Sequence, residues 1–343
     1  MIDKGAQHMG EEMSRYNLGS FVVLICLFGM WLFVENFLIA QQLPEEYESM
    51  GGHGISLNHA AVAATDGVAA VRVNPALLSK QKVYNLACGY QWPTVGREFY
   101  QAGVVDGRTS KISAGISYTS FSDNYIYYRQ SEKADINDSP IARRGSLALS
   151  QTLGQWALGV GFTYVEGFPF WSELVFDGKD SQKPQLKKGV GANLGISFAL
   201  NSQIDLGAAV ENISNPKVSS YLPRTGRVGL AYRWAQELQL LFDYRNRERV
   251  PEFEGPAIEE ANGKNRATEL DPEQAIIGGF EAQIQDVIRL TGSIGISADK
   301  RQFASAGLAV VNKSFTLAYG IRRPNLEKSV NQHAISTSFD LSI

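Results

Sequence analysis

Cysteine is nearly absent from this sequence of 343 residues, which excludes a fold held together by disulfides. Cys26 falls in an apolar segment near the N-terminus, so Cys88 has no intramolecular partner in the rest of the chain. An excess of one charge is also lacking, since 32 Lys and Arg oppose 35 Asp and Glu. This near-neutral balance argues for neither nucleic acid nor an anionic substrate as the partner.

Long hydrophobic runs are lacking beyond residue 40, and the one before it is short. Lys4 and Arg15 precede "FVVLICLFGMWLFV", a run below the ~20 residues that a helical membrane span needs. A basic flank, a short apolar core and the small residue Ala40 predict a signal peptide over 1–40, cleaved after Ala40. An uncleaved anchor helix is the alternative. The long basic region leaves Met1, Met9 and Met13 open as the start.

Period-two alternation is what the remaining sequence has instead. In "QWALGVGFTYV", the large side chains from Trp156 to Tyr164 alternate with Ala157, Gly159, Gly161 and Thr163. Such alternation is typical of strands with one apolar face. We count about fourteen of these segments, at 82–92, 97–106, 110–120, 142–153, 155–166, 188–200, 202–212, 225–234, 236–248, 274–284, 286–298, 301–312, 313–323 and 332–343.

Connection lengths give an independent signal. Every second connection is short, as in "LGQ" and "AQE", whereas most of the others are long, including 121–141 and 247–273. Short turns on one side and long loops on the other indicate an outer-membrane barrel, with the short turns in the periplasm. Aromatic residues at the expected strand ends fit interfacial girdles: Tyr90, Trp92, Tyr118, Tyr164, Trp156, Tyr232 and Trp234.

Charged residues within the strands must face the lumen, because a charge facing lipid costs ~2–4 kcal/mol. Structural ion pairs along the barrel wall are the expected role for most of them, with Asp205, Glu211 and Asp340 as further acidic partners. The predicted lumen charges are Arg227, Arg233, Asp243, Arg245, Arg247, Arg289 and Arg322. A barrel of this size encloses space that something must fill or use.

An Ala- and Val-rich segment lies between the predicted cleavage site and the first strand. It includes "DGVAAVRVNPALLSK" at 66–80, which is too apolar to remain in water as a tail. We therefore expect residues 41–81 to fold back into the lumen as a plug, with the barrel over 82–343. Asp66 is expected to act as the N-cap of a short helix. Asn74-Pro75 is expected to end that helix at the first strand.

This segment resembles the Asp-x-x-Ala-x-x-x-Asn-Pro-Ala stretch of the FadL-like outer-membrane proteins. That superfamily includes long-chain fatty-acid transporters and barrel proteins of the type IX secretion system. The resemblance implies a 14-stranded barrel with an N-terminal hatch, in which Asn74, Pro75 and Ala76 couple the hatch to ligand. Leu77-Leu78 replaces the Gly-Leu of the transporters and is closer to the secretion-associated branch. No kink is evident in the third strand, so a lateral exit has no support in the sequence.

Catalytic motifs are missing: the sequence has no Gly-x-Ser-x-Gly elbow and no phosphate-binding glycine loop. His53, His59 and His333 lack metal-ligand spacing, and "GGHG" at 51–54 is expected to be a flexible turn. A barrel hydrolase built on His333 and serines of neighbouring strands is the one enzymatic alternative. An inward histidine that is simply satisfied by its neighbours is the simpler interpretation. We predict no enzyme activity, no cofactor and no metal.

Three functions remain open. The first is transport of small hydrophobic, fatty-acid-like compounds through a hatch-plugged lumen at the outer membrane, in contact with its lipids. The second is a secretion or assembly component that holds a protein partner at the cell surface, and the third is a structural barrel. The apolar loop "EGFPFWSELVFDG" fits a hydrophobic ligand, a protein partner or simple packing over the mouth of the barrel.

Overall fold

The structure is a computed structural model, which describes residues 51–57, 60–93, 97–123, 141–167, 187–214, 224–248, 273–298, 300, 302–323 and 331–341. The predicted signal peptide at 1–40, plug residues 41–50, His59 and most of each long connection lie outside the described residues.

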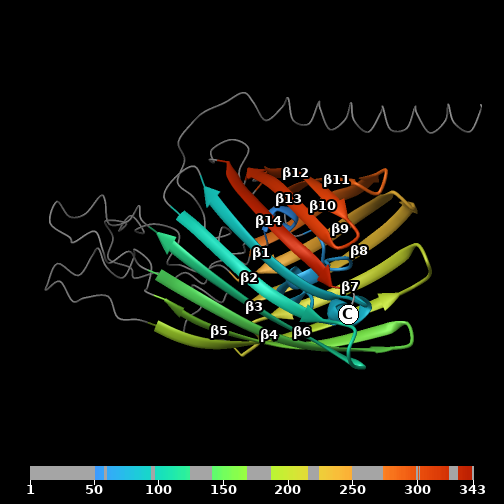
Figure 1. Cartoon of the computed structure of the whole chain (residues 1–343). Coiled ribbons are helices and arrows are strands. Elements are labelled where there is room, and N and C mark those ends of the chain that lie inside the picture. The colour runs from blue at the N-terminus through green and yellow to red at the C-terminus, as the bar shows by residue number, and fades with distance from the viewer. Residues whose placement is uncertain are drawn as a thin grey trace, which may run out of the picture. The chain divides into compact units, whose positions relative to one another are not determined.

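Fourteen antiparallel strands close into a barrel, in which neighbours along the chain pair and β1 also pairs with β14 (Figure 1). Closure leaves no strand edge with unpaired backbone groups, which is what lets a β-sheet cross lipid. The predicted 14-stranded barrel is confirmed, with boundaries within a few residues of those expected. The strands are β1 Tyr84–Pro93, β2 Arg97–Asp106, β3 Ile112–Asp123, β4 Ile141–Leu153, β5 Trp156–Gly167, β6 Lys187–Ala199, β7 Ile204–Glu211, β8 Thr225–Ala235, β9 Leu238–Arg247, β10 Glu273–Ile284, β11 Ile288–Ser297, β12 Gln302–Asn312, β13 Phe315–Arg323 and β14 Gln332–Leu341.

Strand connections alternate in length as expected, apart from the short ones that follow β1 and β11. Those after each even-numbered strand from β2 to β12 are short, from two residues between β4 and β5 to five between β2 and β3. These turns gather at one end of the barrel, together with the last described strand end of β14 (Figure 1). We call this the short-turn end and the opposite end the long-loop end. Strand β3 pairs without a register shift with both β2 and β4, so it carries no kink.

Side chains alternate between the two faces of the wall. Along β5 every second residue is buried, and the outward set includes Leu158, Val160 and Phe162, which are 46%, 43% and 53% exposed. Leucine, valine, isoleucine and aromatic residues occupy outward positions on the other strands as well. An apolar outer face with a mixed polar and small-residue interior is the arrangement of a transmembrane barrel.

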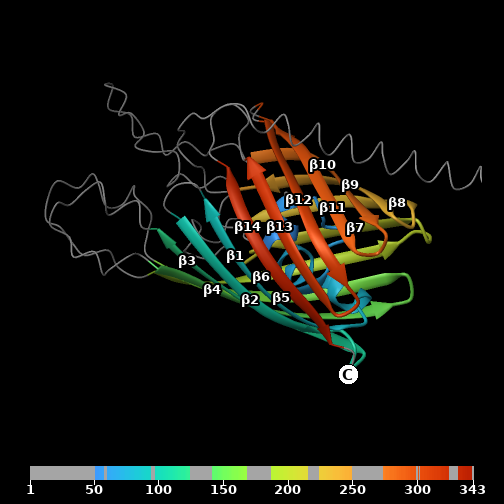
Figure 2. The same cartoon turned by 45° about the horizontal axis from the view of Figure 1, so that its top comes forward.

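The helical residues between 51 and 80 lie inside the ring of strands, as both views show (Figures 1 and 2). They form α2 Gly51–Ser56, the 3-10 turn η2 Gly67–Ala69, α3 Ala70–Val73 and the 3-10 helix η3 Pro75–Lys80. We call the described residues 51–57 and 60–83 the plug. The predicted plug with a short helix is confirmed. The expectation for "GGHG" was wrong, because these residues are the helical start of α2 rather than a flexible turn.

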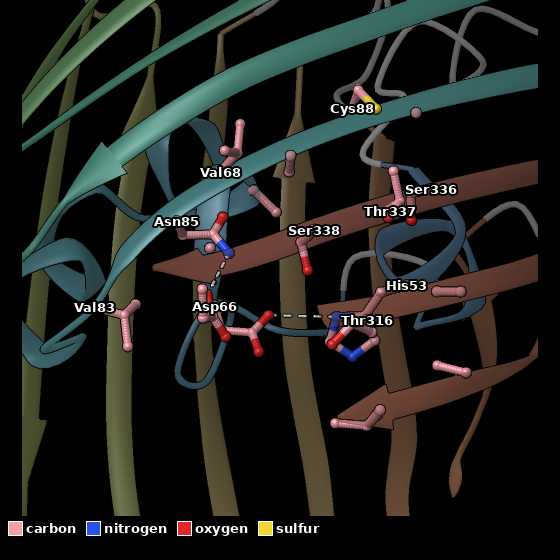
Figure 3. Close-up of a pocket in the computed structure, with 18 of the residues that line it drawn as sticks. His53, Asp66, Val68, Val83, Asn85, Cys88, Thr316, Ser336, Thr337 and Ser338 are labelled. Carbon is pink, nitrogen blue, oxygen red and sulfur yellow. Dashed lines mark hydrogen bonds and ion pairs between the residues drawn. The ribbon is translucent and has the colours of Figure 1, made fainter. Parts of the chain in front are cut away.

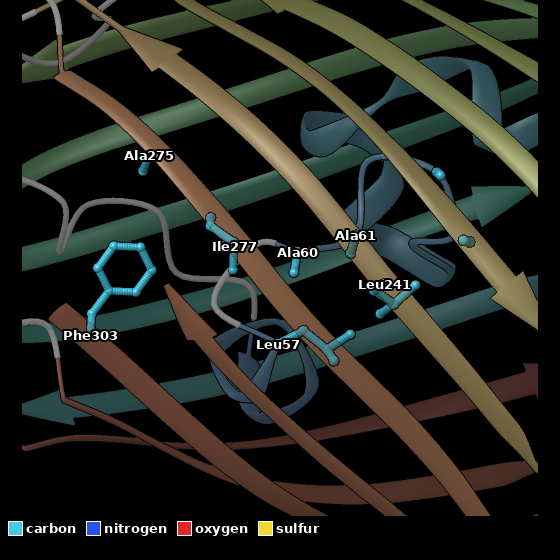
Figure 4. Packing of buried hydrophobic residues seen from close by; sticks show 9 residues of the cluster. Leu57, Ala60, Ala61, Leu241, Ala275, Ile277 and Phe303 are labelled. Carbon is cyan, nitrogen blue, oxygen red and sulfur yellow. The ribbon is translucent and has the colours of Figure 1, made fainter. Parts of the chain in front are cut away.

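Glycines on the inner face of the wall let the plug backbone approach closely. A Cβ at Gly159 would lie 2.3 Å from the Ala76 nitrogen, and one at Gly207 would lie 2.3 Å from the Val62 carbonyl oxygen. Similar clashes with plug atoms arise at Gly103, Gly115, Gly195, Gly229 and Gly307. Apolar contacts complete the packing, as where Leu57, Ala60 and Ala61 of the plug contact Leu241, Ile277 and Phe303 of the wall (Figure 4).

Candidate functional site: the plug and the lumen

Asn74 joins two parts of the plug to the barrel wall. Its side chain is fully buried, and its Nδ2 donates hydrogen bonds to the carbonyl oxygens of Val62 at 2.8 Å and of Ile196 on β6 at 3.1 Å. Its Oδ1 accepts the N–H of Ala76, so the same side chain caps η3. The backbone of Asn74 is extended, as expected before proline. One amide therefore fixes the plug to itself and to the wall.

Asn74-Pro75 ends a helix, as expected, but the expectation that it joins this helix to the first strand was wrong. Helix α3 ends at Val73, but Pro75 starts a second helical segment, η3, which runs to Lys80. Proline suits this first helical position because its missing N–H would have had no partner there. The step is a joint between two short helices packed against the wall.

Strand β4 holds η3 through hydroxyl groups. Ser150 Oγ donates to the carbonyl oxygen of Ala76 at 2.8 Å and lies 2.9 Å from Ser79 Oγ. Thr152 Oγ1 is also within 2.9 Å of Ser79 Oγ. At the end of η3, Lys80 Nζ is 2.7 Å from Asp205, whose other oxygen pairs with Arg233. These contacts are short and numerous, so η3 is a well-anchored part of the plug.

A four-residue charge cluster ties α2 and the loop before η2 to strands β10 and β11. His53 Nε2 lies 2.7 Å from Glu281, and His53 Nδ1 lies 3.4 Å from Asp66. Arg289 completes the cluster, with Nη1 at 3.6 Å from Asp66 and Nε at 3.4 Å from Glu281. Two cations are thus each shared between the same two carboxylates.

Asp66 precedes η2 in the N-cap position, but its side chain makes no capping hydrogen bond, so the predicted N-cap role was wrong. The carboxylate is engaged by His53 and Arg289 instead. A cationic partner outcompetes a local backbone N–H here because two full opposite charges attract more strongly than a carboxylate and a neutral N–H.

Protonation of His53 is favoured by this cluster. Burial by itself opposes the charged imidazolium, but the carboxylates of Glu281 and Asp66 outweigh it and raise the pKa of His53 to about 9. The pKa of Asp66 is lowered, because its contacts with His53 and Arg289 outweigh the desolvation of its carboxylate inside the barrel. At neutral pH the cluster therefore holds two cations and two anions.

A cavity of about 300 Å³ lies between the plug and the wall at the short-turn end. Figure 3 shows His53, Asp66, Asn85, Ser336 and Ser338 around it. One part of its lining is polar and includes Arg289, Asp340, Gln81, Gln101 and Thr316. The other part is formed by small apolar side chains, among them Val68, Ala69, Ala87, Ala309, Val311 and Ala318. The cavity could hold a small molecule with one polar and one apolar part.

Buried arginines mark the opposite half of the lumen. Near the long-loop ends of their strands, five inward arginine side chains are each less than a tenth exposed: Arg144, Arg227, Arg245, Arg247 and Arg322. Arg227 pairs with Glu211 at 3.1 Å. Asp243 accepts the N–H of Val62 at 2.9 Å, so it holds the plug. The first contact braces the wall, and the second anchors the plug.

The predicted site residues are not gathered in one place. Asn74, Pro75 and Ala76 pack against β4 to β6, whereas Asp66 and Arg289 meet at the cavity near β11. Leu77 and Leu78 are buried in an apolar cluster with Val71 and Val105. Arg233 is half exposed at the short-turn end, where it pairs with Asp205.

Sequence reasoning missed His53 and Glu281 as functional candidates. No local pattern connects two residues 228 positions apart, so only the folded barrel reveals their pairing. Asn85 was also missed, although its place on the inward face of β1 follows from strand alternation. The inward glycines carried an unused signal, because glycine on a lumen face indicates close approach of another backbone.

His333 does not face the lumen serines, so the arrangement required for the hydrolase alternative is absent. Its Nδ1 lies 2.7 Å from the Tyr319 hydroxyl, and its ring stacks on Trp92 at 5.9 Å. All three belong to the outward face of their strands, on which the neighbouring residue Ile335 is 40% exposed. Within the part of the chain that the structure describes, no group of His, Cys, Asp and Glu could hold a metal ion.

The described residues contain no helix that is long and apolar enough to cross a membrane.

Solved structures with the same architecture are found among transporters. The toluene transporter TodX of Pseudomonas putida aligns with a TM-score of 0.60 over 87% of this chain and 99% of its own, at 12% identity. The toluene transporter TbuX of Ralstonia pickettii aligns with a TM-score of 0.58 over 86% and 98%, also at 12% identity. This likeness shows a shared fold, which is the fold that the FadL-like resemblance implied. The resemblance noted in the sequence is therefore confirmed for the fold.

No protein-family profile and no curated protein sequence matches this chain. At 12% identity the solved structures share the FadL-like fold without showing a shared substrate.

Proposed function

We propose that this protein is a non-enzymatic channel of the Gram-negative outer membrane that admits small hydrophobic compounds through a lumen gated by the plug. The observation that carries the proposal is Asn74, whose buried amide holds the plug to the wall by hydrogen bonds that a small displacement breaks. The fold shared with TodX and TbuX, which are described as toluene transporters, supports it.

The outward face supports the proposed location. Its apolar residues fit contact with membrane lipids. We also propose that residues 1–40 are a signal peptide, which is removed when the protein is exported. The proposed domains are the plug at 41–81 and the barrel at 82–343. A fatty-acid-like compound, which carries a carboxylate, is one class of transported molecule that this function includes.

A disulfide that joins the plug to the wall, and that can be reduced again, tests whether the plug must move for transport. Ser79 Oγ of η3 and Ser150 Oγ of β4 are 2.9 Å apart, and both residues are buried, so cysteines placed at both positions should be close enough to bridge. The native Cys88 is exposed and is first replaced by serine. We expect Ser79→Cys/Ser150→Cys in this background to lose toluene uptake on oxidation and to recover it on reduction.

The two single-cysteine variants are the matched controls, and neither should respond to oxidation. Uptake that continues in the oxidised, cross-linked protein would contradict gating by this segment. An absence of toluene uptake through the wild-type protein would contradict transport altogether and leave the secretion or assembly role as the better hypothesis.

A further inference from the structure

The cavity at the short-turn end has a chemical preference that follows from its lining. We propose, building on the transport function above, that it binds the polar end of a small amphiphile that donates hydrogen bonds and carries no negative charge, such as an amine or an alcohol. A carboxylate is disfavoured. The argument rests on which lining groups are already engaged and which are not.

The two cations at the cavity are already occupied. His53 lies between the carboxylates of Glu281 and Asp66, and Arg289 contacts the same two residues. A ligand carboxylate would have to displace one of these contacts, and the displaced carboxylate would lose its partner in a confined space. The cluster therefore offers an incoming anion no unshared positive charge.

A further carboxylate makes the net charge of the groups around the cavity negative. Asp340 also lines the cavity, and its Oδ1 accepts a hydrogen bond from Asn85 Nδ2 at 2.7 Å. Counting His53 and Arg289 as positive and Asp66, Glu281 and Asp340 as negative leaves an excess of one negative charge. Coulomb repulsion at a few ångströms is appreciable in a partly desolvated cavity, so a ligand anion is opposed there.

Asn85 supplies an acceptor that lacks a partner. Its side chain is only 4% exposed, and the carboxylate of Asp340 can only accept, so the amide nitrogen must face Asp340. This orientation leaves Asn85 Oδ1 without a hydrogen bond; the atom is buried beside Gly67, and both residues line the cavity. Gln101 Oε1, on the adjacent strand, lacks one as well. A buried acceptor without a partner is costly, and a donor on the ligand would remove that cost.

The apolar part of the lining suits the rest of such a molecule. Val68 of the plug and Val311, Ala309 and Ala318 of the wall present small side chains. A volume of about 300 Å³ is at the lower end of ligand pockets, which limits the occupant to one small molecule.

Three probes that differ in one group test the proposal: benzylamine, benzyl alcohol and benzoate. Their binding to the full-length protein in detergent is measured by calorimetry at neutral pH. We expect benzylamine and benzyl alcohol to bind about tenfold or more tightly than benzoate. Asp340→Asn should remove most of the advantage of benzylamine over benzoate, because it deletes the uncompensated charge and keeps an oxygen for Asn85.

Asp286→Asn is the matched control, since it makes the same change of charge on the exposed turn between β10 and β11, outside the cavity lining. It should leave all three affinities unchanged, and heat-modifiable gel mobility shows whether each variant is folded. Benzoate binding as tightly as benzylamine, or equal effects of the two variants, would overturn the inference. Toluene uptake is measured in parallel: its failure would overturn the transport function, whereas uptake with a benzoate preference overturns only the preference proposed here.

Discussion

Asn74 and Ile196 are 122 positions apart in the chain, yet the Asn74 amide donates a hydrogen bond to the Ile196 carbonyl oxygen at 3.1 Å. Ile196 belongs to β6, and its side chain points outward. The plug can approach the backbone of Ile196 because the neighbouring residue Gly195 has no side chain. The contact links the plug to a strand without any side chain from the wall. A displacement of Asn74 away from β6 breaks it.

Loss of the Asn74-Pro75 joint should loosen the plug and spare the barrel. Replacing both residues by alanine leaves the buried Val62 carbonyl oxygen and the Ala76 N–H without their Asn74 partner, at about 1–3 kcal/mol for each group, and removes the second donor to the Ile196 carbonyl oxygen, which stays paired within the sheet. We expect larger or noisier single-channel conductance in planar bilayers and faster uptake of a hydrophobic probe. Strand pairing is untouched, so heat-modifiable mobility should persist. Conductance and uptake like those of the wild type in a folded variant would make the joint a mere connector.

Gly195 should tolerate no side chain. A Cβ there would lie 2.1 Å from Asn74 Oδ1 and 2.9 Å from Pro75 Cδ, so Gly195→Ala must push the plug away from β6. We expect raised conductance, as for the Asn74 variant. Gly145→Ala is the matched control, since its Cβ would meet no atom within 4 Å, and it should behave as the wild type. Identical behaviour of the two variants would show that the plug does not rest on β6.

The charge cluster predicts plug release at alkaline pH. Because the pKa of His53 is raised from 6.5 to about 9, its protonation stabilises the docked plug fully below about pH 6.5, and this contribution is lost as the pH rises through about 9. Conductance should therefore increase across that interval. His53→Gln should abolish this dependence, because glutamine has no proton to lose. A pH profile unchanged by His53→Gln would exclude the cluster as the source.

Sidedness follows from connection length. A cysteine at position 262, in the segment 247–273, should react with a membrane-impermeant reagent in intact cells. A cysteine at position 202, in the short turn between β6 and β7, should react only after the outer membrane is opened. Asn201 itself is left unsubstituted, because its Oδ1 accepts hydrogen bonds from the N–H groups of Gln203 and Ile204 and stabilises the turn. Labelling with the reverse pattern would place the short turns outside the cell.

Much of the candidate site was beyond the reach of sequence reasoning. The segment around Asn74 was recognisable from its composition and its Asn-Pro step, but the direction of its hydrogen bonds was not. The position of Asp66 before a short helix predicted an N-cap. In the folded barrel, however, the Asp66 carboxylate pairs with His53 and Arg289 and makes no capping hydrogen bond. Local preference fails where a charged partner arrives from a distant strand.

The amino-acid sequence by itself determined the strands, their inward and outward faces and the alternation of short and long connections. These depend on a two-residue periodicity and on turn length, both of which are local properties of the chain. Only the tertiary structure decided that His53 meets Glu281 and that Asn85 meets Asp340, since closure of the barrel brings β1 beside β14. Contacts between residues hundreds of positions apart depend on how the plug is seated within the closed barrel, and no local pattern encodes that placement.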